Sequence, residues 1–589
     1  MHALPKTATV LLAALMVTAC ARVAQDDRDP AATATLAPAQ TPARPAAAAA
    51  ASSANAGAAP EARKAVAPAS SRSDLDGFSK RRVEMAVVMA GDAAALSVHP
   101  APAAEQRERY QSLAHNPVQQ VAQAPVSTFS LDVDTGSYSN VRRMLVAGQL
   151  PPPDAVRVEE LVNYFPYQYD PPGDGSPFAV HTELAPSPWN PGNVILRIGV
   201  KGQDQAKHTL PPANLVFLVD VSGSMDSPDK LPLLKSSLKL LVKELRARDR
   251  ITLVTYSGST AVALPPTPGN QAAAITLAID TLRAGGSTAG ASGIELAYRA
   301  AQQAFIPDGI NRILLATDGD FNVGVTDFQQ LKAMVEEKRK SGVALTTLGF
   351  GTGNYNEQLM EQLADAGDGA YSYIDTLMEG HKVLVNEMTS TLATIARDVK
   401  VQVEFNPAAV REYRLIGYEN RTLQREDFNN DRVDAGDIGA GHTVTALYEL
   451  TLADGTGLID DSRYGLNDAR PAGRHGDELA HVKLRFKEPG ADTSRRLDMA
   501  VRKASMKPLA LASGELRFAL AVAGFGQMLR GGRYTGEWTF FDARALAGSA
   551  VGADRFGYRG EFLRLVDLAQ SLSTRKVGEA GAVVVPRGR

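Results

Sequence analysis

The sequence predicts a doubly wound α/β domain with a mainly parallel sheet over residues 212–398. Short, continuously apolar segments alternate there with longer segments of helical spacing, which is the pattern of buried parallel strands joined by helices. Residues with oxygen-bearing side chains follow several of the predicted strands. We also predict a small N-terminal α+β module (residues 125–205) and a C-terminal β-rich and helical domain (residues 399–575), followed by a tail (576–589).

The elements of the α/β domain follow one another in a regular order. Strands are predicted at residues 214–220, 250–256, 261–264, 311–318, 343–351 and 370–374. Helices are predicted at residues 231–245, 270–283, 290–305, 326–340 and 356–365, before a closing helix. Leucines in the first helix recur at steps of three and four residues and form one apolar stripe, which comprises Leu231, Leu234, Leu238, Leu241 and Leu245.

The flanking regions mix strands and helices. In the N-terminal module we expect strands at 128–134 and 193–200, and helices at 138–147 and 154–164 with Asp154 as N-cap. Asp132 and Asp134 could ligate a metal, but we interpret them as surface polar residues. In the C-terminal domain we expect strands at 399–404, 413–418, 443–451 and 481–487, and amphipathic helices at 514–530 and 559–572.

Composition excludes several classes of function. The 589 residues contain 62 Lys and Arg against 65 Asp and Glu, a formal net charge of −3, which gives no overall reason to expect nucleic-acid binding. The single cysteine, Cys20, rules out an intramolecular disulfide and any cysteine-based zinc or iron–sulfur site.

The first 19 residues have the organisation of an export signal. Lys6 precedes an apolar run over residues 8–17, which is too short to span a bilayer as a helix. Residues 17–20 (VTAC) resemble a bacterial lipobox, which implies that Cys20 is lipidated and becomes the mature N-terminus. An ordinary secretory signal is the alternative. Ala21 resembles the sorting pattern for the outer rather than the inner membrane, so we expect a lipid-anchored envelope protein that faces the periplasm or the surface.

A tether is predicted between the lipid and the folded part of the chain, over residues 20–124. Residues 31–70 contain 20 Ala and 5 Pro and almost no large apolar side chains. Such a segment buries too little surface to offset the entropy of ordering it.

A metal site is predicted at the carboxyl edge of the parallel sheet, where ligands of doubly wound sheets bind. Asp220, Ser222 and Ser224 follow the first strand, and Asp318 ends a later one. Thr288 follows a Gly-Gly-Ser turn that opens a helix. Two carboxylates and three hydroxyls form a set of hard oxygen donors, which suits Mg²⁺ or Mn²⁺ rather than zinc.

These residues resemble the metal-ion-dependent adhesion site of von Willebrand factor type A domains. The resemblance implies that the hydroxyls bind the ion directly, that the aspartates hold it largely through water, and that one position stays open for an Asp or Glu of a partner protein. A type A domain that binds no metal is the alternative. Residues 128–143, 158–169 and 399–574 resemble the flanks of YfbK-like bacterial lipoproteins, so the resemblance covers about residues 125–575.

Catalytic and nucleotide-binding motifs give weaker signals. No phosphate-binding P-loop occurs, and the segment Gly349–Asn354 (GFGTGN) lacks the last glycine of a dinucleotide motif, so no nucleotide is expected. Ser222 as a nucleophile would need a histidine base, and the only candidate in the domain is His381, inside a helix. His475 and His481 are six residues apart, which does not match the zinc-protease spacing.

The acidic segment 427–434 resembles a calcium loop in its alternate acids. However, Arg432 stands where an EF-hand requires glycine and Ile438 where it requires glutamate, so a polar loop between strands is the better interpretation.

We therefore expect a binding protein and not an enzyme. Its partner would be a protein that offers a carboxylate to the metal, and its lipid would join it to the membrane. One alternative is an envelope scaffold whose metal site is capped by its own flanking domains. A remote alternative is a metal-assisted hydrolase at the same site.

Overall fold

The computed structural model describes most of the chain from residue 108 onward. The described residues are 108–131, 134–173, 175–288, 290–319, 328–460 and 475–581. The predicted signal peptide, Cys20, most of the tether and Asp132 lie outside them, so the corresponding predictions are not addressed by the structure.

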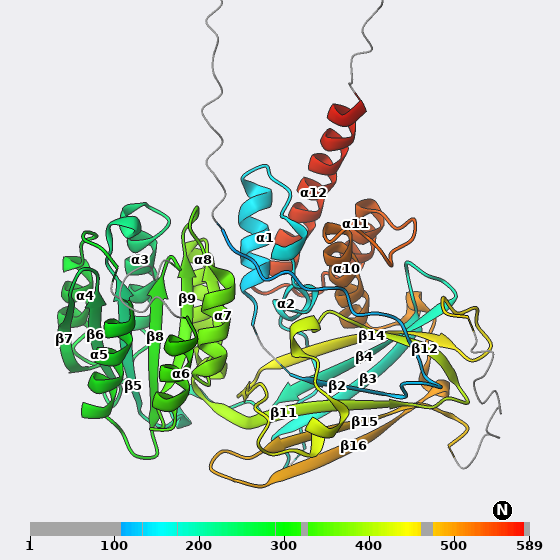
Figure 1. Cartoon of the computed structure of the whole chain (residues 1–589), viewed down its shortest axis with the longest axis horizontal. Coiled ribbons are helices and arrows are strands. Elements are labelled where there is room, and N and C mark those ends of the chain that lie inside the picture. The colour runs from blue at the N-terminus through cyan, green and yellow to red at the C-terminus, as the bar shows by residue number, and fades with distance from the viewer. Residues whose placement is uncertain are drawn as a thin grey trace, which may run out of the picture. The chain divides into compact units, whose positions relative to one another are not determined.

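A six-stranded sheet forms the centre of the α/β domain, in the strand order β10-β9-β8-β5-β6-β7 (Figure 1). All neighbours are parallel except β6 and β7. The chain runs from β5 to β6 on one side and later returns to β8 on the other side, so the strand order reverses between β5 and β8. The strands are β5 (Ala213–Asp220), β6 (Arg250–Tyr256), β7 (Thr260–Pro268), β8 (Ile310–Thr317), β9 (Ala344–Phe350) and β10 (Tyr371–Ile374).

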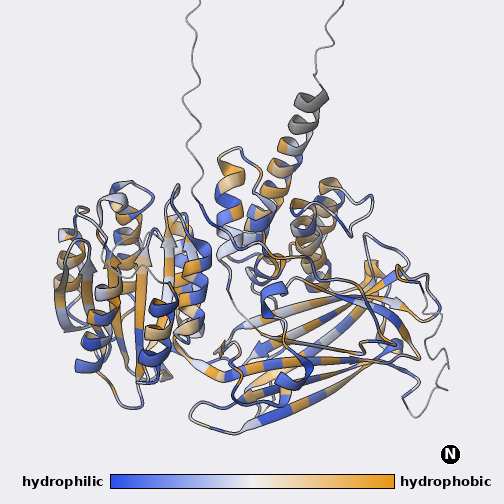
Figure 2. Cartoon of the chain, in the orientation of Figure 1, coloured by the Kyte–Doolittle hydropathy of each residue, from blue (hydrophilic) through white to orange (hydrophobic). Residues whose placement is uncertain are grey.

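Helices cover both faces of this sheet, which confirms the predicted doubly wound fold. On one face pack α3 (Leu231–Val242), α4 (Ala272–Thr281) and the closing helical segment, α8 (Leu377–His381) to α9 (Met388–Leu392). On the other face pack α5 (Gly290–Gln303), α6 (Phe328–Arg339) and α7 (Glu357–Ala366). The middle residues of the central strands, which are buried on both sides, are apolar: residues 215–219 in β5 and 313–316 in β8 (Figure 2).

Two further sheets are built jointly by the regions on either side of the α/β domain. The first has the order β1-β12-β14-β4-β3, and the second the order β13-β11-β15-β16, with β2 paired to β11. Their strands are β1 (Gln119–Gln120), β2 (Val126–Ser130), β3 (Phe178–Pro186), β4 (Asn193–Gly202), β11 (Thr394–Phe405), β12 (Val410–Ile416), β13 (Ile438–Gly439), β14 (Thr443–Leu452), β15 (Glu478–Lys487) and β16 (Ser494–Arg502). One apolar core lies between the two sheets, so they form a sandwich.

The remaining helices pack together on the first of these sheets. They are α1 (Gly136–Val146), α2 (Val158–Asn163), α10 (Gly514–Leu529), α11 (Phe540–Gly548) and α12 (Tyr558–Gly581). Residues 125–205 and 399–575, which we predicted as separate bodies, therefore share both a core and their sheets. No helix of the described residues is long and apolar enough to cross a membrane.

Two details of the N-terminal region correct the prediction. Asp154 lies in a 3-10 turn (Pro153–Ala155) and does not cap the following helix, which begins at Val158 after Arg157. Asp134 is not a surface residue: its side chain is buried, accepts a hydrogen bond from the backbone N–H of Tyr371 at 2.7 Å and pairs with Arg421 at 3.2 Å. Asp134 is therefore a buried acid whose charge is compensated by Arg421, and not a surface polar residue.

Candidate metal centre

The predicted metal ligands lie at the carboxyl ends of β5 and β8, on either side of the point where the strand order reverses. Asp220 is the last residue of β5, and Asp318 directly follows β8. Residues Val219 and Ala316 pair across the two strands just before these ends. The sheet topology therefore brings the two aspartates to one edge of the sheet from positions almost one hundred residues apart.

The loop after β5 places two hydroxyls beside the first carboxylate. The backbone N–H of Ser222 donates to Asp220 Oδ1 at 2.9 Å, and the Oγ atoms of Ser222 and Ser224 are 3.0 Å apart. Thr317 donates its hydroxyl to Asp220 Oδ2 at 2.9 Å. Ser222 is buried and Ser224 is exposed, so this part of the site is accessible to solvent at Ser224.

The loop that carries Thr288 is joined to the first loop through its backbone. The N–H of Gly285 donates to the carbonyl of Val221 at 2.8 Å, and the N–H of Gly223 donates to the carbonyl of Gly286 at 3.0 Å. Gly286 has a φ of 87°, which glycine adopts without strain. These contacts hold the buried Thr288 at the same edge as the serines.

Asp318 has two polar neighbours that the sequence analysis missed. The Nζ atom of Lys230 lies 2.9 Å from Asp318 Oδ2, and Nδ2 of Asn354 donates to the same oxygen at 3.4 Å. Lys230 also donates to Oδ1 of Asn354 at 3.3 Å. The sequence offered one signal for Lys230: it lies between the two serines and the start of an apolar helix. Asn354 ends the GFGTGN segment, in which Gly351 leaves room for the side chain of Lys230.

Burial controls the electrostatics of the site. Burial raises the pKa of Asp220 to about 6, while hydrogen bonds from Ser222 and Thr317 oppose this rise and the charge of Asp318 adds to it. Two buried carboxylates at one sheet edge favour a cation between them. With the three hydroxyls they make an oxygen-only donor set, which fits Mg²⁺ or Mn²⁺.

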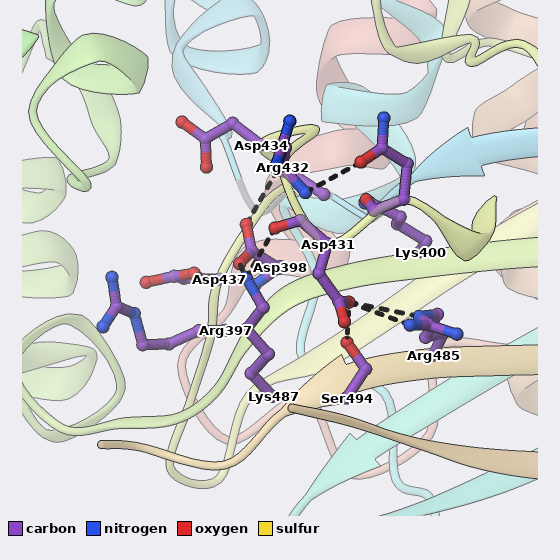
Figure 3. Close-up of polar contacts among 12 residues, drawn as sticks. Arg397, Asp398, Lys400, Asp431, Arg432, Asp434, Asp437, Arg485, Lys487 and Ser494 are labelled. Atoms are coloured by element: carbon purple, nitrogen blue, oxygen red, sulfur yellow. Dashed lines mark hydrogen bonds and ion pairs between the residues drawn. The ribbon is translucent and has the colours of Figure 1, made fainter. Parts of the chain in front are cut away.

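The acidic segment 427–434 is occupied by contacts within the protein. Asp427 caps its own 3-10 turn by accepting from the backbone N–H of Gln424 at 3.1 Å. Asp431 accepts from Arg485 at 3.0 Å and from Ser494 (Figure 3). Asp434 pairs with Arg339 at 2.7 Å. Within the described ranges, no group of three His, Cys, Asp or Glu side chains is arranged to hold a metal. These contacts favour a polar loop over a calcium loop.

Two histidines from the sequence analysis, His381 as a candidate base and His475 as part of a zinc-protease spacing, are both exposed. His381 ends α8 and is exposed. His475 is exposed and lies 3.4 Å from Glu478.

Models of three known families match consecutive parts of the chain. "Von Willebrand factor type A domain" matches residues 214–387, and "von Willebrand factor" matches residues 104–197. "Uncharacterized protein YfbK, C-terminal" matches residues 390–572. The first of these confirms the type A fold of the α/β domain.

Individual proteins are similar to all or part of the chain. Inter-alpha-trypsin inhibitor heavy chain H3 of Homo sapiens is 24% identical over 302 residues, which cover 47% of this chain and 33% of that protein. A solved structure, von Willebrand factor type A from Catenulispora acidiphila, is 15% identical, covers 66% of this chain and 90% of that one, and has a TM-score of 0.37. The names of these relatives denote no enzyme.

A bacterial relative matches most of the chain. "Uncharacterized protein YfbK" of Escherichia coli (strain K12) is 52% identical over 472 residues, which cover 79% of this chain and 81% of the relative. Because this identity extends over the type A domain and both flanking regions, the chain belongs to the YfbK family of proteins with a von Willebrand factor type A domain.

Proposed function

We propose that the protein binds a partner protein through a Mg²⁺ or Mn²⁺ ion held by Asp220, Ser222, Ser224, Thr288 and Asp318. The observation that carries this proposal is the pair of serine hydroxyls 3.0 Å apart, next to a buried carboxylate and at the reversal point of the sheet. Neutral hydroxyl ligands leave much of the ion's charge uncompensated, so a carboxylate from outside would be attracted strongly.

A direct measurement of metal binding tests this proposal first. In a calorimetric titration of the full-length protein, we expect Mg²⁺ to bind the wild type and to bind Thr288→Ala at least about tenfold more weakly. The matched control is Thr281→Ala, because Thr281 is an exposed threonine at the end of α4. Equal affinity in the wild type and in Thr288→Ala would contradict the assignment of the site.

Retention of a partner tests the second half of the proposal. The full-length protein is immobilised and exposed to an envelope extract in Mg²⁺ or in EDTA. We expect a protein that is retained by the wild type and by Thr281→Ala in Mg²⁺, and that is lost in EDTA and with Thr288→Ala. Identical retention in all conditions would refute metal-dependent adhesion.

We further propose that a lipid on Cys20 anchors the protein in the cell envelope, with the outer membrane favoured by Ala21. The support for this is the VTAC segment at the end of a short apolar run, together with the absence of any other cysteine from the chain. The predicted tether would leave the folded part able to reach a partner at a distance from the membrane.

An internally capped scaffold is the second candidate, and one contact favours it. Glu108, at the start of the described chain, accepts a hydrogen bond from the backbone N–H of Gly353 at 3.1 Å, next to Asn354 of the metal centre. The N-terminal segment therefore contacts the loop beside the site. If this segment caps the site, Glu108→Gln will change the Mg²⁺ affinity, whereas an envelope extract will leave it unchanged.

A further inference from the structure

Lys230 is a buried cation built into the metal centre. Its side chain is only 8% exposed, and its Nζ atom lies 2.9 Å from Oδ2 of the fully buried Asp318. It is also within hydrogen-bond distance of Asn354. A cation in this position contacts a metal-site carboxylate directly, so it alters the charge available to a bound ion.

The backbone fixes Lys230 in this position. Its carbonyl accepts from the N–H of Leu234 at 2.9 Å, in the first turn of α3, and its own N–H donates to the carbonyl of Ser227 at 3.0 Å. The stem of its side chain crosses Gly351, where a Cβ atom would lie 2.3 Å from Cγ and Cε of the lysine. Gly351 has a φ of 76°, so both its conformation and its lack of a side chain serve this packing.

The formal charges of the site show what the lysine does. Asp220 and Asp318 together carry −2 when ionised, and Lys230 reduces this to −1. A divalent ion then leaves the site at +1, whereas without the lysine the loaded site would be neutral. Asp229 lies nearby, but its carboxylate accepts from Ser227 and Thr352, and its charge is the same with or without the lysine.

We propose that Lys230 is a specificity-determining residue that weakens metal binding and keeps the loaded site positive, so that the site selects a partner with a carboxylate over one with a neutral oxygen. This inference rests on the proposed function, since it assumes that the ion binds. Repulsion between the ammonium and the ion lowers metal affinity. The same positive charge strengthens the attraction of an incoming anion.

Manganese affinity tests the first part of the inference. Mn²⁺ is titrated into the full-length protein and free Mn²⁺ is measured by electron paramagnetic resonance. We expect Lys230→Met, which keeps an unbranched apolar stem, to bind Mn²⁺ about tenfold or more tightly than the wild type. Lys239→Met is the matched control, because Lys239 lies on α3, the helix that follows Lys230, and pairs with Asp280 at the surface. The Mn²⁺ affinity of this variant should equal that of the wild type.

A carboxylate probe tests the second part. Acetate that binds to protein-bound Mn²⁺ displaces water and lowers the proton relaxation rate of the solvent. We expect acetate to lower this rate at concentrations several-fold lower in the wild type than in Lys230→Met, and we expect neutral acetamide to show no such difference. Equal acetate responses in the two proteins would overturn the proposed selection of carboxylates.

The outcomes separate this inference from the proposed function. If the wild type binds no Mn²⁺, the proposed function fails and this inference fails with it. If the wild type binds Mn²⁺ and Lys230→Met binds it equally or more weakly, only the role of Lys230 is overturned. Lys230→Gln, which is also neutral, must behave like Lys230→Met, and thermal melting of each variant verifies that it is folded.

Discussion

The guanidinium of Arg142 on α1 lies 2.8 Å from the carboxylate of Glu379 on α8, and both side chains are buried. The same guanidinium pairs with Asp375, which follows β10, and donates to the hydroxyl of Tyr164 at 3.0 Å. Glu561 on α12 is a third acidic partner, at 3.0 Å. One arginine thus connects the type A domain with helices from both flanking regions.

We predict that Arg142→Met destabilises the protein by about 3–5 kcal/mol, because it leaves Asp375 and Glu379 buried without their cation. The midpoint of urea unfolding measures the effect. Arg495→Met is the control: Arg495 is half exposed and pairs with Glu488 at the surface, so its loss should change stability by less than about 0.5 kcal/mol. Similar shifts in the two variants would show that the buried cluster has no special role.

We predict that stability falls as the pH rises from about 5 to 8, owing to a buried carboxylate cluster between α2 and α7. Burial raises the pKa of Glu357 to about 8, with Arg157 opposing and Glu361 adding to the shift, and burial raises the pKa of Glu159 to about 7. The folded state therefore keeps protons that the unfolded state, with pKa values near 4.5, has released. The stabilisation that these protonated glutamates provide is complete below the pKa of the unfolded state. It is lost as the pH rises toward the pKa values of the folded state.

The variant Glu357→Gln tests this origin of the pH dependence. It should reduce the loss of stability between pH 5 and 8 by at least about 1 kcal/mol, measured as melting temperatures across that range. Glu337→Gln, which alters an exposed glutamate on α6, should keep the slope of the wild type. An unchanged slope in Glu357→Gln would contradict the prediction.

We predict that Gly439→Ala destabilises the contact between the closing helix of the type A domain and the sandwich. A Cβ atom at Gly439 would lie 1.6 Å from the backbone oxygen of Ser390 on α9, so the backbone would have to shift. Such overpacking costs about 1–3 kcal/mol, which chemical denaturation can measure. Gly514→Ala is the control, because a Cβ there meets no atom within 4 Å and alanine favours a helix.

We predict that Cys20→Ser moves the protein from the membrane fraction to the soluble fraction. Without the Cys20 thiol no lipid can be attached, so the proposed anchor is lost. Incorporation of radiolabelled palmitate should occur in the wild type and be absent from the variant. Wild-type protein without label would contradict the lipidation.

Local patterns in the sequence were sufficient to predict most elements of the type A domain. The predicted strand 250–256 coincides with β6. The leucines of the stripe up to Leu241 mark the buried face of α3, which ends at Val242, so Leu245 lies beyond the helix. The strand β3 and the strand β16 were missed. Burial in β16 is incomplete and uneven along the strand, so its alternation of polar and apolar residues is weak.

Sequence motifs predicted only part of the candidate site, namely the residues that lie in local motifs or at strand ends. Asp220, Ser222 and Ser224 are adjacent in sequence, and strand ends in a parallel sheet converge by topology, so Asp318 could be added. Lys230 and Asn354 could not, because they are 124 residues apart and meet only when α3 and the loop after β9 pack together.

The sequence alone determined the type A domain and its oxygen-bearing edge, because hydrophobic periodicity and a five-residue motif are local properties. Only the tertiary structure decided that residues 125–205 and 399–575 share two sheets and one helical core, since strand pairing across hundreds of residues leaves no local signal. It also decided the charge of the candidate metal centre. Lysine side chains are usually exposed. Lys230 is buried because it packs against Gly351 and pairs with Asp318.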